Sequence, residues 1–98
     1  MLLAALLASA SLQLTPQAPG LAELRLCFDP PTPAIRYELL VIAQGPAGRS
    51  QSRQRGMADE ICPVRNSLHM PASTRVEAHL RWWVDEVEQE PVVTAISM

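Results

Sequence analysis

The sequence contains no lysine, and its eight basic residues are all arginine. Together with ten acidic residues they give a formal net charge of −2. This charge argues against a nucleic-acid-binding protein whose affinity depends on a general positive field. Arginine is a planar cation with several donors that suits carboxylates and carbonyl-rich surfaces, although a high-GC genome would produce the same bias.

Long helices and membrane spans are not expected from the pattern either. Nine prolines punctuate the 98 residues, and a proline inside a helix costs about 3 kcal/mol. The apolar run 2–7 is far shorter than the roughly 20 apolar residues that span a bilayer. Hydrophobic residues still make up 48% of the chain, which is enough for the core of one small folded domain.

Signatures of catalysis and metal binding are missing too. His69 and His79 stand in separate strand candidates without HxH or HExxH spacing, and there is no G-x-S-x-G nucleophile motif. We expect no catalytic residue, no metal site and no cofactor. Cys27 and Cys62 do not form a C-x-x-C motif. They are compatible with one disulfide in an exported chain, but sequence alone does not settle their geometry.

The N-terminal stretch "MLLAALLASASLQ" resembles an export signal. Its apolar run is followed by an A-x-A site at Ala8, Ser9 and Ala10, which suits signal peptidase, although a positive n-region is missing. We expect residues 1–10 to be a truncated signal segment and residues 11–98 to form the single domain. The alternative is that the leucines of the run belong to a folded first element.

Most of the chain alternates between apolar and polar residues, which is the signature of strands. Three longer segments (22–29, 34–44 and 75–86) and four shorter ones (12–15, 53–62, 67–70 and 92–98) predict seven strands. Seven short antiparallel strands with frequent turns favour an all-β, immunoglobulin-like β-sandwich. In the second segment, Leu40 and Ile42 make both faces apolar, as in a central or partner-contacting strand.

The segment 74–90 also permits a helix, because Leu80, Trp83 and Val87 share helical spacing. We prefer a strand, since the alternation there is unbroken. In a strand, Trp83 falls on the polar face, either as an exposed anchor for a partner or under a neighbouring loop.

The stretch "GPAGRSQSRQRG", residues 45–56, is the most distinctive part of the sequence. Gly45 and Gly48 around a Pro-Ala pair predict a tight hairpin turn. Beyond the turn, alternation places Arg49, Gln51, Arg53 and Arg55 on one face and Ser50, Ser52 and Gln54 on the other. Since neither face is apolar before Met57, we expect an edge strand or a projecting ribbon. Without a lysine and a following helix the stretch is unsuited to binding phosphate.

This hairpin resembles the family of small periplasmic curli proteins that includes CsgC and its α-proteobacterial relative CsgH. The similarity covers Gly45-x-x-Gly48-x-Ser50-Gln51-Ser52-Arg53-Gln54 and extends loosely through "NSLHMPASTRVEAHL". Enterobacterial members carry a C-x-C motif before the strand that leads into the hairpin. Here Pro33 and Ile35 occupy those places, so a redox role based on that motif is unsupported.

The resemblance implies a periplasmic, non-enzymatic, chaperone-like inhibitor of amyloid formation by curli subunits (CsgA-like). The partner-binding residues would be Arg49, Gln51, Arg53, Gln54 and Arg55. We expect a monomer that binds its client transiently and has no nucleic-acid partner and no membrane span. Two other functions stay open: a thiol-disulfide redox partner that uses Cys27 and Cys62, and an immunoglobulin-like module that binds another envelope protein.

Overall fold

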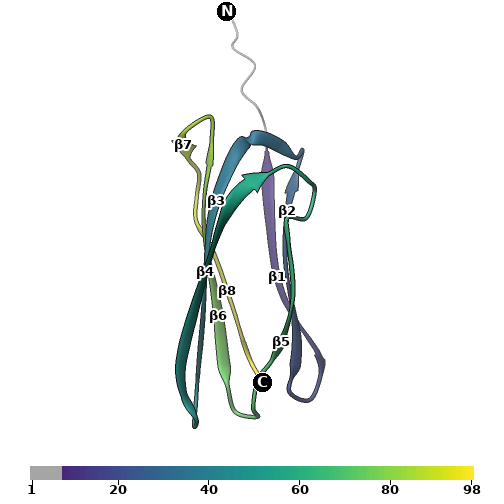
Figure 1. Cartoon of the computed structure of the whole chain (residues 1–98), viewed down its shortest axis with the longest axis vertical. Helices are drawn as coiled ribbons and strands as arrows, with labels where there is room; N and C mark the ends of the chain where they lie inside the picture. The colour runs from purple at the N-terminus through teal and green to yellow at the C-terminus, as the bar shows by residue number, and fades with distance from the viewer. Residues whose placement is uncertain (1–7) are drawn as a thin grey trace, which may run out of the picture.

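The computed structural model describes residues 8–98, and every regular element in that part of the chain is a β-strand. The strands are β1 (Ser9–Ala18), β2 (Leu21–Asp29), β3 (Thr32–Gly45), β4 (Gly48–Ala58), β5 (Val64–His69), β6 (Arg75–Val84), β7 (Val87–Glu88) and β8 (Val92–Ser97). They form two antiparallel sheets that face each other, as predicted for a β-sandwich (Figure 1). No helix in residues 8–98 is long and apolar enough to cross a membrane.

The first sheet has the order β1-β2-β5, and the second has the order β4-β3-β6, with β7 and β8 both paired to β6. The helical alternative for 74–90 is wrong. Residues 75–84 form β6, which pairs with β3 on one side and with β7 and β8 on the other. Valine and tryptophan suit this position, because branched and aromatic side chains pack well between two neighbouring strands.

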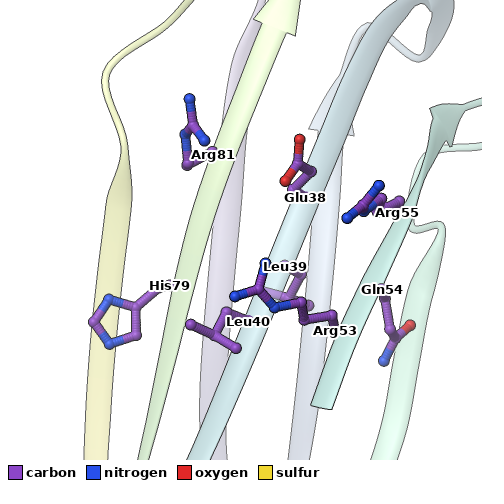
Figure 2. A pocket seen from close by; sticks show the side chains of 8 residues that line it. All are labelled: Glu38, Leu39, Leu40, Arg53, Gln54, Arg55, His79 and Arg81. Atoms are coloured by element: carbon purple, nitrogen blue, oxygen red, sulfur yellow. The ribbon is translucent and has the colours of Figure 1, made fainter. Parts of the chain in front are cut away.

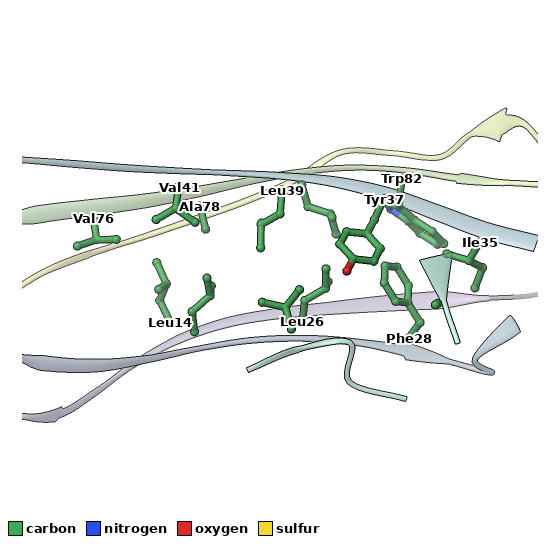
Figure 3. Close-up of a cluster of buried hydrophobic side chains, with 14 of the residues drawn as sticks. Leu14, Leu26, Phe28, Ile35, Tyr37, Leu39, Val41, Val76, Ala78 and Trp82 are labelled. Atoms are coloured by element: carbon green, nitrogen blue, oxygen red, sulfur yellow. The ribbon is translucent and has the colours of Figure 1, made fainter. Parts of the chain in front are cut away.

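The core lies between the sheets and follows the alternation that the sequence predicts. Buried side chains come from every second residue of β2, β3 and β6: Ala22, Leu24, Leu26, Phe28, Ile35, Tyr37, Leu39, Val41, Ala43, Val76, Ala78, Leu80, Trp82 and Val84. The Phe28 ring connects the two layers, with its centroid 5.9 Å from that of Tyr37 and 5.6 Å from that of Trp82 (Figure 3).

β4 is the outermost strand of the second sheet, so the predicted edge position of the arginine-rich stretch is confirmed. The first sheet has only three strands and leaves part of the inner side of β4 uncovered. Ser50 and Ser52 lie on that side and are exposed. This is why the strand tolerates polar residues on both faces.

The predicted bounds of this strand, 53–62, were wrong at both ends. β4 begins at Gly48, directly after the turn, because the arginine-rich stretch pairs with β3 along its whole length. It ends at Ala58, where the chain turns and the Asp59 amide donates a hydrogen bond to the Met57 carbonyl at 2.9 Å.

The predicted signal segment lies mostly outside the described residues. Ser9 and Ala10 are described: they belong to β1, where they pair with Asp29 and Phe28 of β2. Cleavage after Ala10 stays a prediction and would shorten β1 by these two residues.

Gly56 is close-packed under the Tyr37 ring, so we expect Gly56→Ala to destabilise the fold. A Cβ atom at this position would lie 2.8 Å from the Tyr37 hydroxyl oxygen and 3.1 Å from its Cζ. Overpacking of this kind costs about 1–3 kcal/mol. Urea denaturation should show a lower midpoint for Gly56→Ala than for Ser52→Ala, a change at an exposed position on the same side of β4. Equal midpoints for the two variants would contradict this packing.

Candidate functional site: the arginine row on the outer edge of the second sheet

The β3–β4 turn places the arginine-rich strand as predicted. Gly45 pairs with Gly48 across the two-residue loop. Gly48 has a φ of 125°, which glycine adopts readily and other residues rarely do. A Cβ atom on Gly45 would lie 2.9 Å from the Thr74 hydroxyl oxygen, so the β5–β6 loop packs directly against the base of the turn.

The register brings four of the five predicted partner-binding residues onto one surface. Arg49, Gln51, Arg53 and Arg55 lie opposite Gln44, Ile42, Leu40 and Glu38 of β3, respectively. All four β4 residues are exposed, and we call them the arginine row. Gln54 is not part of the arginine row, because it pairs with Leu39, whose side chain is in the core. The side chain of Gln54 therefore lies on the inner side of β4, where it is half-buried. A binding role for Gln54 stays a prediction.

Beside the arginine row, the outer face of the second sheet contains a shallow hollow of about 210 Å³. Figure 2 shows Arg53 and Arg55 extending from β4 toward β3, while Leu40 points toward His79 of β6. Leu40 and the neighbouring Ile42 are only half-buried. The face thus combines a small apolar area with a border of arginines, among which Glu38 lies between Arg55 and Arg81 (Figure 2). Such a surface suits an aliphatic side chain next to a carboxylate or an amide.

Charge is distributed unevenly across this face. On the β6 side the basic groups are paired: Arg81 donates two hydrogen bonds of 3.2 Å to Glu88, and Arg75 donates one of 3.2 Å to Glu77. A ring nitrogen of His79 lies 3.4 Å from Glu77. Within residues 8–98, no carboxylate lies within ion-pair distance of the three arginines in the arginine row.

The ion pairs on β6 lower the pKa of the Glu77 and Glu88 carboxyl groups. The side-chain hydrogen bond with His79, followed by the one from Arg75, lowers the pKa of Glu77. The hydrogen bonds from Arg81 do the same for Glu88. Both carboxylates therefore stay ionised to lower pH and keep compensating the cations on β6. The arginines without an ion-pair partner in residues 8–98 lie along β4, where Glu38 of β3 stands opposite Arg55.

Trp83 is buried rather than exposed as a partner anchor. The Arg36 guanidinium carbon lies 4.0 Å from the centroid of its ring, and that of Arg81 lies 5.0 Å from it. Arginines favour the face of tryptophan through cation–π attraction. The indole is thus covered by two side chains from its own sheet, and Trp83 is only 8% exposed.

Cys27 and Cys62 form a disulfide that joins β2 to the β4–β5 loop. Both residues are half-buried, and the Phe28 amide next to Cys27 donates a 2.7 Å hydrogen bond to the Ile61 carbonyl. The disulfide and this hydrogen bond hold the loop after β4 against the first sheet. No group of three or more His, Cys, Asp or Glu residues in the described part of the chain converges on a metal site.

We expect the double variant Cys27→Ser/Cys62→Ser to lose stability but keep its function. The bond closes a loop with a sequence separation of 35 residues, and disulfides of this kind contribute about 2–4 kcal/mol. The variant should have a lower thermal midpoint than the wild type, and adding reductant to the wild type should lower its midpoint by about as much as the two substitutions do. Loss of function in a variant that is still folded would instead favour the redox alternative.

No protein-family model matches the sequence, and no curated protein matches it. Two solved structures are similar. The solution structure of R. palustris CsgH has a TM-score of 0.62 and 18% identity, covering 93% of this chain and 92% of that one. The structure of the E. coli curli protein CsgC has a TM-score of 0.62 and 16% identity, covering 90% of this chain and 96% of that one. The chain therefore has the fold shared by CsgH and the curli protein CsgC.

Proposed function

We propose that this protein is a periplasmic, non-enzymatic inhibitor of amyloid assembly by curli subunits, and that it binds them through the arginine row and the adjoining outer face of the second sheet. The proposal depends mainly on one observation, which is the exposed arginine row on β4. Three exposed arginines without ion-pair partners in the described chain lie along one sheet edge of a protein whose net charge is −2. The shared fold with CsgH and the curli protein CsgC supports the choice of client.

The chemistry of the surface suits such a client. Curli subunits are glutamine- and asparagine-rich repeats whose strand edges template cross-β growth. Arginine guanidinium groups bind carboxylates and carbonyl oxygens through several N–H donors, and Gln51 adds an amide that is both donor and acceptor. Leu40 and Ile42 offer a small area for an aliphatic side chain.

The same residues protect the inhibitor from becoming part of the fibre. A free strand edge normally invites further pairing, and charged side chains on that edge discourage it. A second inhibitor molecule or a growing stack would bring arginines next to each other. The binding should therefore be weak, transient and sensitive to salt, because exposed charges are screened beyond about 10 Å at 0.1 M ionic strength.

Amyloid kinetics with a purified curli subunit test the proposal. Thioflavin-T fluorescence should rise after a longer lag when this protein is present at substoichiometric amounts, and added salt should shorten that lag extension. Bovine serum albumin at the same mass concentration controls for crowding and non-specific adsorption. An unchanged lag at low salt would contradict the proposed function.

A further inference from the structure

The free edge of β4 presents unpaired backbone N–H and C=O groups as well as side chains, and the hydrogen bonds of the sheet identify the residues to which these groups belong. The Asp85 amide donates a 3.0 Å hydrogen bond to the Ala34 carbonyl, so even-numbered residues of β3 bond toward β6. The Gln89 amide donates to the Trp82 carbonyl at 2.8 Å, which gives β6 the matching pattern. Because bonding direction alternates along a strand, the odd-numbered residues of β3 bond toward β4.

Odd-numbered β3 residues pair with even-numbered β4 residues, for example Leu39 with Gln54. The even-numbered β4 residues thus direct their amides and carbonyls to β3, and the odd-numbered ones direct theirs away from the sheet. Met57 marks the end of this edge, since its outward carbonyl already accepts a hydrogen bond from Asp59. The open backbone groups belong to Arg49, Gln51, Arg53 and Arg55, the same residues that carry the arginine row.

We infer that this edge is a strand-addition site for an extended segment with acidic side chains at every second residue. An added strand would form its hydrogen-bonded pairs with the arginine row, and side chains in such pairs lie on the same face. Carboxylates opposite Arg49, Arg53 and Arg55 would then pair with guanidinium groups that have no ion-pair partner in the described chain. Arg53 and Arg55 extend toward β3 in the free protein (Figure 2), so their exposed side chains would turn outward to reach the added strand. Residues in between would lie beside Ser50 and Ser52, where the inner side of β4 is open and polar.

The positive charge of the arginine row determines which kind of strand can pair with the edge of β4. Pairing of two β4 edges from two copies of this chain would bring arginines together across strands, and like charges in that position are destabilising. An uncharged strand would gain the backbone hydrogen bonds but leave the arginines unmatched. An alternating acidic strand satisfies both the backbone and the side chains.

The inference rests on the proposed function for its biological partner, and it requires that the client contain an extended segment with carboxylates at every second residue besides its glutamine- and asparagine-rich repeats. A synthetic peptide tests it separately. The probe is the capped peptide Glu-Thr-Glu-Thr-Gln-Thr-Glu, which in antiparallel register places its glutamates opposite Arg55, Arg53 and Arg49. Calorimetry at low salt should show saturable binding. A peptide of the same composition with its glutamates on both faces should bind about tenfold more weakly, because only some of them can reach the row.

Backbone methylation separates strand addition from general attraction between charges. N-methylation of the second glutamate removes an amide that faces β4 and should weaken binding about tenfold, the effect of one lost hydrogen bond. N-methylation of the threonine that follows removes an amide that faces solvent and should have much less effect. Equal losses from both methylations, or no saturable binding of the unmodified peptide, would overturn the inference.

The protein offers a matched pair of variants at the same edge. Gln51→Pro and Gln51→Ala both remove the side-chain amide, but only proline removes the outward N–H, and proline is tolerated on edge strands. Amide exchange measured by NMR should be fast at the odd positions of β4 in the free protein and slow once the peptide is bound. Gln51→Pro should bind the peptide about tenfold more weakly than Gln51→Ala.

Two outcomes distinguish this inference from the proposed function. If the peptide adds to the edge but the protein does not delay curli assembly, strand addition stands and the proposed client is wrong. If Gln51→Pro delays curli assembly as strongly as Gln51→Ala, the client does not add to this edge, and the inference is overturned for the client while the proposed function survives.

Discussion

Replacing Arg53 and Arg55 by glutamine should remove most of the delay that the protein imposes on curli assembly, without unfolding it. Both side chains are exposed and have no ion-pair partner in the described chain, so the fold does not depend on them. A client that contacts these two arginines in the wild type would lose two charge-assisted contacts in the double variant. About tenfold more of the double variant should therefore be needed to produce the lag given by the wild type.

The first sheet supplies the matched control for this experiment. Arg25 and Arg65 lie opposite each other on β2 and β5, and their replacement by glutamine removes the same amount of charge from the opposite side of the sandwich. It also removes the 2.8 Å ion pair between Arg25 and Glu23, a loss that Arg53 and Arg55 do not share. This control should delay assembly as the wild type does. If both double variants lose activity equally, net charge rather than the arginine row is responsible. Circular dichroism and thermal midpoints should show that both variants stay folded.

Phe28→Ala should have the largest effect on stability. Its side chain is 1% exposed and lies between the sheets against Tyr37 and Trp82. Truncating a buried phenylalanine costs about 3–5 kcal/mol, against a total of about 5–15 kcal/mol for a typical domain. Urea denaturation followed by tryptophan fluorescence should show a large drop in the midpoint or an unfolded chain.

Val93→Ala is the control for that measurement, because Val93 lies on β8 and is 59% exposed. Substitution there should change the free energy of unfolding by only about 0.5 kcal/mol. Similar losses for the two variants would mean that the aromatic cluster does not hold the two sheets together.

The sequence predicts the fold well where one face of a strand is buried. Leu24, Leu26 and Phe28 alternate with polar residues because one side of β2 faces the core and the other faces water. The hairpin is predictable for a local reason, since only the two residues of a Pro-Ala loop separate Gly45 from Gly48. Alternation then correctly groups the residues of the arginine row.

Features that depend on contacts between distant segments are not predictable in this way. Trp83 is covered because β3 and β6 pair in a register that sets Arg36 beside it, and no local pattern gives that register. The strand candidate begins at residue 53 rather than at Gly48 because polar residues on both faces carry no alternation of hydrophobicity, and only the turn and the spacing of the arginines indicate an extended ribbon before it. They are stable in a strand here because the first sheet does not reach across them.

NMR titration of the ¹⁵N-labelled protein with unlabelled monomeric curli subunit tests the central claim most directly. At low salt, the account predicts that resonances of Arg49, Gln51, Arg53 and Arg55 and of their neighbours on the outer face of β3 shift or broaden. Those of Arg25 and Arg65 on the first sheet should stay unchanged. Perturbations confined to the first sheet, or none under conditions where the protein delays assembly, would contradict the account.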